Sequence, residues 1–583
     1  MKFSPIPLSI VQPDSFLTSY TNGDPSLDSF YSFYPFSSNT LQDLSSRKVK
    51  SLKRTVTNQR DDIVEVLKDF HHWLGIEQSQ AAVRAKLLED DSYCVVTGQQ
   101  LTWYAGPLYT FFKLMSAIQW SQSISEIIGK TVIPVFWLAD EDHDYSEINQ
   151  INWYQSQVSA SDLKNTSILK KFLADVEQTS LQEQIGMPVG KIKGDSSLLK
   201  NKFFKWLTKH HPIEEVTQQA VEKTAQFREN TWIQAFLQET KKTYSDDKTH
   251  AQNFALWITH VFEEYEFLVA GSNHDSIKKL LSPIISKAVT NDLSITKLLK
   301  SQTSELNKQS FQSQVSVMDS QWFVFNEDAK RVKLNLDSTT GEYFFIQKGG
   351  KKRLNSNELF ELTQEQPERF SPNVFIRPIL QDHLLPVIAY VGGPSEIAYH
   401  GQMKKIYEFF GLEMPILIPR LSATIRERRV QRLMAKFPFS LAHYQEGFPS
   451  LKNKWLSTLP QQFPEAKLDE LEQHILGQYQ SQLINIISFD QSLEGSIGKT
   501  KNEISKAMQS FIKKARKAHE SKFEYELRQL YFLQSYLFPE GPMERVLHPI
   551  YFMLYYGKNF WQDLLGELLA QETDSFNHYL IDL

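Results

Sequence analysis

The chain has 583 residues, of which 41% are hydrophobic and 22% are charged, a composition typical of a large globular protein. A formal net charge of −5 argues against a dedicated nucleic-acid-binding protein, and the single cysteine, Cys94, excludes a disulfide within the chain and a cysteine-rich zinc site. The amino-terminal residues do not resemble a signal peptide and no run of 18 apolar residues occurs, so we expect no membrane association and a cytoplasmic location.

The first 150 residues (1–150) predict N-terminal helices followed by half of an α/β core. Apolar residues recur at helical spacing up to about residue 90. The run YCVVT at 93–97 predicts a buried strand, the segment 107–128 predicts a helix with an apolar face, and VIPVFWL at 132–138 predicts a second strand. Two strands joined by a helix in this way pair in parallel through a right-handed crossover, so we expect a β-α-β unit.

Residues 151–368 interrupt this pattern and predict an insertion. The stretch is polar and helix-like to about residue 310, and alternation with turn signals at 315–353 predicts a small β-rich module. The α/β pattern resumes at 369–425, where LPVIAYV at 385–391 and the segment 414–418 predict two more strands. A helix that ends near residue 410 is expected to connect them.

The last part of the chain, residues 426–583, predicts a helical domain. One set of apolar residues has the 4-3-4-3 spacing of a coiled-coil seam, namely Ile504, Met508, Phe511, Ala515 and Ala518. Only about two heptads are clean, so a helical hairpin or bundle fits the pattern as well as a long coiled coil does.

Three polar loops should converge at one edge of the predicted sheet, because ligands of open parallel sheets bind beyond the carboxyl ends of the strands. The loops contain Thr97, Gly98, Gln99 and Gln100, then Asp140, Glu141, Asp142, His143 and Asp144, and finally Gly392, Gly393, Ser395 and Glu396. We therefore predict a polar small-molecule site where these loops meet.

The acidic loop at 140–144 carries the strongest chemical signal. Its four carboxylates and one imidazole could supply a general base, bind an ammonium group or hold Mg²⁺. The ordinary alternative is a solvated acidic loop that caps the next helix. A position directly after a buried strand favours the functional interpretation, and Asp142 and Asp144 flank His143 as orienting partners.

The other two loops offer weaker signals. The side-chain amides of Gln99 and Gln100 both donate and accept hydrogen bonds, and Gly98 would allow close approach of the backbone. We expect free backbone N–H groups at Gly392 and Gly393 that could bind a phosphate or a carboxylate. The ordinary alternative for both loops is a strand-to-helix turn.

A segment before the third strand adds further polar candidates. Arg377 could clamp a carboxylate with two hydrogen bonds, and Gln381 and Asp382 follow on the same segment. The alternative for Arg377 is a structural ion pair. These three residues complete the set of substrate-binding candidates that the residues themselves indicate.

Long stretches of the chain resemble one family of enzymes. In order, they are VVTGQQLTWYAGPLYTFFKLMSAI, VIPVFWLADEDHDYSEIN, RPILQDHLLPVIAYVGGPSEIAYHGQMKKIYEFFG, LIPRLSATI and LFPEGPMERVLHPIYFMLYYG. They are similar to segments of the bacillithiol synthases, a family of cysteine ligases, and together they span nearly the whole chain. The resemblance implies a Rossmann-type α/β core similar to class I aminoacyl-tRNA synthetases, with connecting-peptide insertions and a C-terminal helical coiled-coil domain that mediates a homodimer.

The resemblance also implies a reaction and a cofactor. The reaction is amide formation between the carboxylate of cysteine and the amine of glucosaminyl-malate, the last step of bacillithiol synthesis. Tyr109, within the first of these stretches, is a further candidate substrate contact. An ATP or ADP site carries over by position to Arg420, Ser422, Thr424, Phe538, Pro539, Glu540, Gly541, Glu544, Arg545 and Gly557. Without the resemblance, the residue types of the segment 537–546 indicate an ordinary turn between helices.

Two features depart from related enzymes. The chain lacks clear HIGH and KMSKS signatures, so an adenylate mechanism does not carry over from the class I synthetases. The analogous cysteine ligase of mycothiol synthesis selects the thiol with zinc held partly by cysteines, whereas Cys94 is the only cysteine here and lies in a predicted buried strand. Thiol selection must work differently or rest on His and Asp ligands, and the sequence assigns no metal ligands.

Catalysis is expected at Asp142, His143 or Asp144. The sugar amine must lose a proton before it attacks, and a positioned base contributes about 10²–10⁴-fold to the rate. ATP is the simplest source of the activation that amide formation needs. The alternative is a metal-dependent amide hydrolase that uses the same three residues, and the remaining interpretation is a non-enzymatic scaffold assembled through the C-terminal helices.

Overall fold

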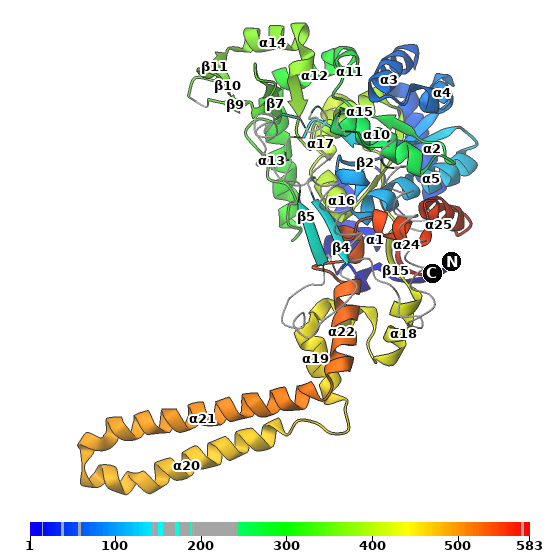
Figure 1. The fold of residues 1–583 in the computed structure, drawn as a ribbon. Coiled ribbons are helices and arrows are strands. Elements are labelled where there is room, and N and C mark those ends of the chain that lie inside the picture. The colour runs from blue at the N-terminus through cyan, green and yellow to red at the C-terminus, as the bar shows by residue number, and fades with distance from the viewer. Residues whose placement is uncertain are drawn as a thin grey trace. The chain divides into compact units, whose positions relative to one another are not determined.

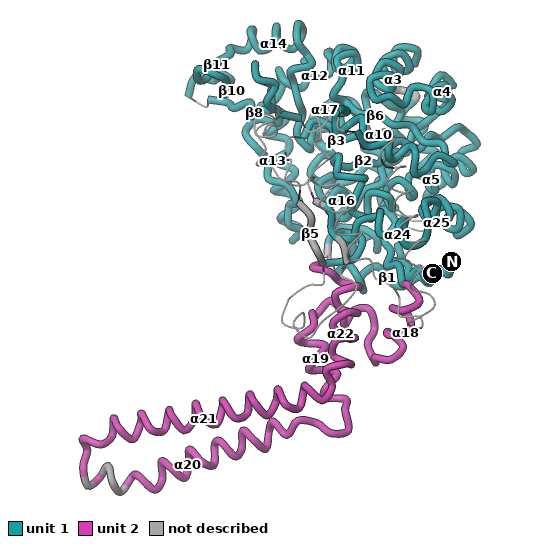
Figure 2. Tube along the Cα trace, in the orientation of Figure 1, with its two compact units in different colours: residues 1–156, 169–426, 541–583 teal, residues 157–168, 427–540 magenta. Residues whose placement is uncertain are grey.

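The computed structural model describes residues 1–13, 15–36, 40–55, 60–142, 144, 148, 150–154, 169–173, 187–188, 191, 240, 243–245, 247–337, 339–572 and 576–583. The chain forms two units, shown in Figure 2. The first unit comprises Met1–Ser156, Leu169–Arg426 and Gly541–Leu583, and the second comprises Gln157–Ile168 and Glu427–Glu540. This division differs from the sequence-based one at the C-terminal end, because residues 541–583 group with the α/β unit and not with the helices before them.

A parallel sheet lies at the centre of the first unit, where Figure 1 labels β2. Its five strands, in spatial order, are β14 (Ile416–Pro419), β13 (Val387–Gly392), β2 (Tyr93–Gln100), β3 (Val132–Ala139) and β6 (Leu268–Ala270). Every neighbouring pair is parallel. The strands are buried almost throughout, which explains why they are short continuous apolar runs without alternation. The predicted parallel α/β core is confirmed.

The strand order creates a topological switch point between β2 and β13. From β2 the chain adds β3 and then β6 on one side, whereas β13 and β14 lie on the other side. Ligands of open parallel sheets bind outside the carboxyl ends of the strands at such a point. β6 comes from the segment that the sequence predicts as an insertion, so this segment also completes the core sheet.

Helices connect the strands of the sheet. α5 (Leu108–Ile128) links β2 to β3 and is buried along most of its length. α15 (Arg377–Leu384) precedes β13. Between β13 and β14, the single helix expected from the sequence is divided into α16 (Pro394–His400) and α17 (Lys404–Phe410).

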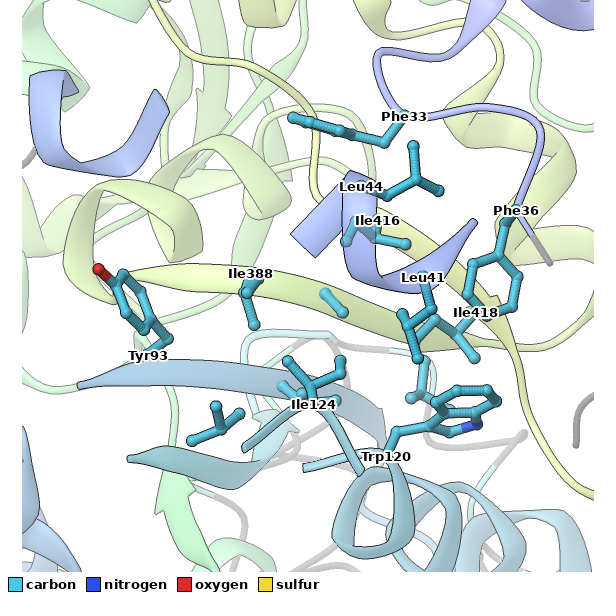
Figure 3. Packing of buried hydrophobic residues seen from close by; sticks show 14 of the residues in the cluster. Phe33, Phe36, Leu41, Leu44, Tyr93, Trp120, Ile124, Ile388, Ile416 and Ile418 are labelled. Atoms are coloured by element: carbon cyan, nitrogen blue, oxygen red, sulfur yellow. The ribbon is translucent and has the colours of Figure 1, made fainter. Parts of the chain in front are cut away.

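Two helices that contact each other pack their apolar side chains against the sheet. Figure 3 shows apolar side chains of β13 and β14 meeting those of α5 and of α2 (Leu41–Thr55). The residues labelled there are Phe33, Phe36, Leu41, Leu44, Tyr93, Trp120, Ile124, Ile388, Ile416 and Ile418. Burial of large apolar side chains contributes about 1.5–3 kcal/mol each, so this cluster holds the strand ends in fixed positions.

The insertion contributes helices and the small β-rich module. The module consists of two three-stranded sheets, with the orders β12-β7-β8 and β11-β10-β9. Its strands are β7 (Trp322–Phe325), β8 (Arg331–Lys333), β9 (Asn335–Leu336), β10 (Tyr343–Gln347), β11 (Gly350–Leu354) and β12 (Phe370–Pro372). All pairs among them are antiparallel, and the β-rich module that the alternation predicts is present.

The remaining helices of the first unit surround this core. They are α1 (Ser15–Thr21), α3 (Arg60–Leu74), α4 (Glu77–Ala85), α10 (His250–Val261), α11 (Asp275–Leu280), α12 (Ser282–Thr290), α13 (Asp292–Lys308), α14 (Ser356–Glu365), α23 (Met543–Val546), α24 (Ile550–Tyr556) and α25 (Phe560–Leu569). β4 (Gln150–Tyr154) pairs with β5 (Leu169–Leu173). No helix among the described residues is long and apolar enough to cross a membrane.

The two ends of the chain meet in a separate sheet of the first unit. β1 (Lys2–Pro7) pairs antiparallel with β16 (Asn577–Asp582), and β16 pairs in parallel with β15 (Ser422–Arg426). The sequence-based description missed β1 and β16, because it treated both terminal regions as helical. This sheet explains why residues 541–583 belong to the first unit.

The second unit is helical, and its longest part is a hairpin of two helices (Figure 1). Its helices are α18 (Arg428–Lys436), α19 (Phe448–Ser457), α20 (Glu465–Phe489), α21 (Glu494–Ser521) and α22 (Glu524–Leu537). α20 and α21 pack along each other, so the predicted coiled coil is confirmed in the form of a hairpin. Of the predicted seam residues, Ile504, Met508 and Ala515 are half-buried as expected, whereas Phe511 and Ala518 are exposed, because Ile512 and His519 take the packed positions.

Candidate active site

A cavity of about 770 Å³ lies beyond the carboxyl ends of β2, β3 and β13, at the switch point of the sheet. The predicted site residues that line it are Gly98, Gln99, Gln100, Tyr109, Asp140, Glu141, Asp142, Arg377, Gly393, Ser395, Glu396, Arg420 and Arg545. All three predicted loops therefore contribute to one cavity. Its volume is in the range of about 300–1,000 Å³ that is typical of small-molecule sites.

Other predicted site residues do not line this cavity. They are Thr97, Asp144, Gln381, Asp382, Gly392, Ser422, Thr424, Gly541, Glu544 and Gly557. Phe538, Pro539 and Glu540 belong to the second unit, and His143 lies outside the described residues. The residues carried over as a nucleotide site are thus divided, with only Arg420 and Arg545 at the cavity.

The end of β2 is shaped by its two neighbouring strands. The hydroxyl of Thr97 is fully buried and donates a hydrogen bond to the carbonyl oxygen of Val391, 2.9 Å away, so it ties β2 to β13. At Gly98, a Cβ atom would lie 2.7 Å from the carbonyl oxygen of Trp137 on β3. The close approach of β3 therefore requires a glycine at position 98. The backbone of Gly98 also lines the cavity directly, because no side chain covers it.

Glu141 is neutralised by a buried lysine. The Nζ of Lys278 on α11 lies 2.8 Å from its Oε1, and Ser272 donates a hydrogen bond to the same oxygen. Burial alone would raise the pKa of Glu141, but the charge of Lys278 and the hydrogen bonds from Lys278, Ser272 and Ser371 together outweigh burial and hold this pKa below its ordinary value. Glu141 is thus an ionised carboxylate that already has its cation.

Asp142 is held by an amide and a guanidinium. Gln100 donates a hydrogen bond to its Oδ2 at 2.9 Å, and the Nη1 of Arg331 lies 3.6 Å from its Oδ1. Arg331 is fixed in turn by Ser371 and by the carbonyl oxygen of Pro372, both at 2.9 Å. Asp142 therefore faces the cavity as a carboxylate with partners on both oxygens.

Asp140 differs from these neighbours. Its side chain is 1% exposed and lines the cavity, and neither carboxylate oxygen accepts a hydrogen bond from another described residue. Burial raises the pKa of this carboxyl to about 8, and the negative charge of Glu141 adds to the effect. An unpaired buried carboxyl with high proton affinity is the kind of group that active sites use for proton transfer.

A second charged network lies on the other side of β2. Lys113 of α5 is buried and its Nζ lies 2.5 Å from Oε2 of Glu396 and 2.9 Å from Oε1 of Gln99. The same oxygen of Glu396 accepts the backbone N–H of Gly393 at 2.8 Å, and Tyr390 donates to its other oxygen at 2.6 Å. The expectation of a free N–H at Gly393 is therefore wrong, because Glu396 of the same helix occupies it.

Arg377 presents a guanidinium to the cavity beside Tyr390 and Tyr399, with Gln381 accepting one of its hydrogen bonds at 3.1 Å. Gln381 donates in turn to Asp382 at 3.1 Å, and both lie behind the cavity wall. Burial raises the pKa of Asp382 to about 6. Gln381 and Asp382 therefore support Arg377 from behind and do not reach the cavity themselves.

Glu544 organises a closed network beneath β15. It is fully buried, its Oε1 lies 2.7 Å from Nη2 of Arg420, and its Oε2 accepts hydrogen bonds from Ser422 and from the backbone N–H of residue 423. Thr424 shares a 2.9 Å hydrogen bond with His578 of β16. Ser422, Thr424 and Glu544 thus tie β15 to α23 and β16, and they present no open surface for the nucleotide phosphates that the sequence-based assignment expects.

Arg545 and Gly557 occupy different surroundings from this network. Arg545 is exposed at the cavity, and within the described part of the chain its guanidinium has no ion-pair partner. Gly557 ends α24, away from the cavity. Of the residues assigned to a nucleotide, Arg545 is therefore the one with a charge available to a ligand.

Three charged residues of the site were missed by the sequence analysis, namely Lys113, Lys278 and Arg331. Lys113 carries a usable signal, since it is a lone charge in the apolar helix LYTFFKLMSAI and a buried lysine needs a partner. Lys278 and Arg331 lie in ordinary polar segments, so no local pattern marks them.

Comparisons with known proteins agree with this architecture. The family model described as "Bacillithiol biosynthesis BshC, N-terminal Rossmann-like domain" matches residues 1–211 and 192–421, and "Bacillithiol biosynthesis BshC, C-terminal coiled-coil domain" matches residues 423–583. Three similar relatives are each named "Putative cysteine ligase BshC". The relative from Bacillus cytotoxicus is 28% identical over 538 residues, which is 90% of this chain and 91% of the relative.

The relative from Staphylococcus haemolyticus is 27% identical over 552 residues, covering 94% of each chain. The relative from Prosthecochloris aestuarii is 26% identical over 538 residues, covering 90% of this chain and 89% of the relative. Because the two family models together match nearly every residue, and the structure has the Rossmann-like core and the coiled coil that they describe, the chain belongs to the BshC family of bacillithiol biosynthesis.

Proposed function

We propose that this protein is a cysteine ligase that joins the carboxyl group of cysteine to the amine of glucosaminyl-malate, the last step of bacillithiol synthesis. The relatives named as cysteine ligases support the reaction class. The observation in the structure that supports it best is the charge pattern of the cavity. Carboxylates follow the end of β3, whereas the guanidinium groups of Arg377 and Arg545 reach the cavity from α15 and α23.

This pattern complements the charges of the proposed acceptor. Glucosaminyl-malate carries an ammonium group on the sugar and two carboxylates on the malyl part. Asp140 and Asp142 would attract the ammonium, whereas Arg377 and Arg545 would hold the carboxylates, because guanidinium binds carboxylate with charge-assisted hydrogen bonds. Lys113 and Arg420 also line the cavity, but each is already neutralised by a glutamate, Glu396 for Lys113 and Glu544 for Arg420.

Amide formation from a free carboxylate is uphill in water, so we propose that a nucleoside triphosphate such as ATP activates the cysteine carboxyl group. The residues carried over for a nucleotide do not form one open site in the first unit, since Ser422, Thr424 and Glu544 are enclosed. We therefore assign only Arg545 as a candidate phosphate contact and place no reaction step on the others.

The thiol of cysteine is not selected through a cysteine of the chain. Cys94 is fully buried in β2, and burial raises the pKa of its thiol to about 12. Among the residues described, no three His, Cys, Asp or Glu side chains group in a way that would hold a metal ion. The names of the relatives favour a ligase over the alternative of a metal-dependent amide hydrolase.

The reaction can be tested directly. The purified full-length protein is incubated with glucosaminyl-malate, cysteine and ATP, and mass spectrometry follows bacillithiol together with ADP and AMP. Formation of bacillithiol that depends on all three reactants supports the proposal and identifies the nucleotide product. Hydrolysis of bacillithiol without synthesis under any of these conditions would favour the hydrolase.

We also propose that the protein is a cytoplasmic homodimer assembled through the α20–α21 hairpin. Within that hairpin, Leu471, Ile484 and Phe511 are 45%, 58% and 54% exposed, and exposed large apolar side chains on one helical hairpin favour association with another copy. A thiol substrate and a nucleoside triphosphate are both abundant in the reducing cytoplasm, which supports that location.

A further inference from the structure

We infer that Asp140, and not Asp142 or Asp144, binds the amino group of the sugar and accepts the proton that this group loses before it attacks the cysteine carboxyl group. The inference rests on the proposed ligase function and names the base of that reaction. It changes the expectation from the sequence, in which Asp140 only contacts the substrate and the base lies further along the loop.

The other described carboxylates of the loop are poorly suited to this role. Both oxygens of Asp142 have partners, with Gln100 at 2.9 Å and Arg331 at 3.6 Å. Glu141 is paired with buried Lys278. Asp144 is exposed and does not line the cavity. A carboxylate that already has a hydrogen-bond donor or a cation beside it holds its proton weakly, so it is a poor base.

Asp140 has the opposite surroundings. Its carboxylate lies between the ends of β3 and β6, where a Cβ atom at residue 271 would be only 3.2 Å from Oδ2, so Gly271 leaves the space in which the carboxylate sits. Asp140 is one of the residues that line the cavity, although its side chain is only 1% exposed, and neither of its buried carboxylate oxygens accepts a hydrogen bond from another described residue. A buried carboxylate without partners is costly, and an ammonium group from the substrate would supply both charge and N–H donors.

Few charged groups surround Asp140, and together with burial they favour the protonated form of its carboxyl group. Burial raises its pKa to about 8, with Glu141 raising it further and Lys278 and Lys191 opposing this. Two histidines lie on the neighbouring elements, His71 on α3 and His274 before α11, and burial lowers the pKa of both, so they stay neutral near pH 7 and above. A base whose pKa lies near the working pH combines the right protonation state with useful proton affinity.

The proton transfer balances without a further reactant. One N–H bond of the sugar ammonium breaks and an O–H bond forms on Asp140, which leaves a free amine with its lone pair. The amine then attacks the carbonyl carbon of a cysteine carboxyl group activated as a mixed anhydride with phosphate, for which a nucleoside triphosphate is the co-reactant. The phosphate-containing group leaves with the electron pair of the broken C–O bond, and the second proton of the nitrogen passes to solvent.

The first experiment compares Asp140→Asn with wild type in ligation. We expect kcat to fall by about 10²–10⁴-fold, because the amide side chain has the same shape and no proton affinity. The control is Asp292→Asn, which changes another buried aspartate whose pKa is raised to about 6 but which lies away from the cavity. It should keep the wild-type rate. Wild-type activity in Asp140→Asn would overturn the inference while leaving the ligase function intact, and inactive wild type would instead overturn the ligase function.

The second experiment measures binding and needs no turnover. Wild type should bind glucosaminyl-malate more tightly than N-acetylglucosaminyl-malate, which has no ammonium group, and this preference should weaken by about 10-fold or more as the pH falls from about 8 to about 6 and the carboxyl group takes up its proton. Asp140→Asn should lose both the preference and its pH dependence. A preference that is unchanged over this pH range in wild type, or retained in folded Asp140→Asn, would contradict the inference.

Discussion

The ammonium of Lys278 lies 2.8 Å from the Oε1 atom of Glu141, and both side chains are almost completely buried beside the cavity. Lys278 also donates a hydrogen bond to the carbonyl oxygen of Phe370 at 2.6 Å, which links α11 to the small β module. This pair neutralises one carboxylate of the acidic loop and thereby leaves Asp140 as the carboxyl group without a cation of its own.

Removing one partner of this pair should destabilise the first unit. Lys278→Met leaves Glu141 as a buried charge without a partner, and we expect the free energy of unfolding to fall by about 3–5 kcal/mol in chemical denaturation. The exposed pair Lys405–Glu305 provides the control, since Lys405→Met should cost less than about 1 kcal/mol. If Lys278→Met costs no more than the control, the pair does not hold α11 to the acidic loop.

The same pair predicts how stability depends on pH. The pKa of Glu141 is lower in the folded state than its ordinary value, so its contribution is present above that ordinary value and is lost as the pH falls through the folded pKa. We expect the wild-type protein to lose stability in this acidic range more steeply than Lys278→Met/Glu141→Gln, as measured by thermal unfolding at a series of pH values. Parallel curves would show that the pair does not contribute.

Gly98→Ala should disturb the edge of the sheet that forms the cavity. The added Cβ atom would lie 2.7 Å from the carbonyl oxygen of Trp137, and overpacking of this kind costs about 1–3 kcal/mol. Thermal unfolding checks the loss of stability, and ligation assays should show a lower rate because Gln99 and Gln100 follow directly. Gly477→Ala, where no atom lies within 4 Å of the added Cβ, is the control and should not reduce stability.

Arg377→Met should weaken binding of the malyl part of the acceptor. Loss of a charge-assisted hydrogen bond costs about 1.5–3 kcal/mol, so we expect the KM for glucosaminyl-malate to rise by about 10–100-fold while the KM for cysteine stays nearly constant. Arg353→Met removes an exposed arginine that pairs with Asp337 outside the cavity and should change neither constant. An equal rise in both KM values would indicate a general disturbance of the site.

Phe511→Glu should weaken the proposed dimer without unfolding the hairpin. Phe511 is 54% exposed, whereas its neighbour Ile512 is buried against α20, so the charge would enter the outer face of α21. Analytical ultracentrifugation should show a shift toward monomer for Phe511→Glu, with the helical circular dichroism signal unchanged. A wild-type protein that is monomeric at all concentrations would contradict the dimer.

Four of the five core strands could be predicted because each is a short apolar run, whereas β6, with only three residues, was missed inside the predicted insertion. Their parallel order then places the loops after β2, β3 and β13 at one edge, which is why the sequence locates most of the cavity. The ion pairs could not be predicted in the same way. Glu141 pairs with Lys278 and Asp142 pairs with Arg331, and both partners are distant in the sequence. Ion pairs between residues so far apart in the sequence produce no periodic pattern from which they could be predicted.

Two other features escaped prediction for related reasons. β1 and β16 lie at opposite ends of the sequence and pair with each other. Each has only six residues with a weak alternation of apolar and polar side chains, which does not identify a strand whose partner is so distant in the sequence. In α21, two heptads do not determine every seam position. The packed face continues from Met508 to Ile512 and not to Phe511, and a step of one residue turns a side chain by about 100° around the helix.

The acceptor substrate should bind in the cavity at the switch point, with its amine at Asp140. The most direct measurement is a crystal structure of the full-length protein with glucosaminyl-malate. We predict the sugar nitrogen within hydrogen-bonding distance of Asp140 and the malyl carboxylates at Arg377 and Arg545. Ordered substrate at another position, or in this cavity with the amine directed away from Asp140, would contradict this expectation.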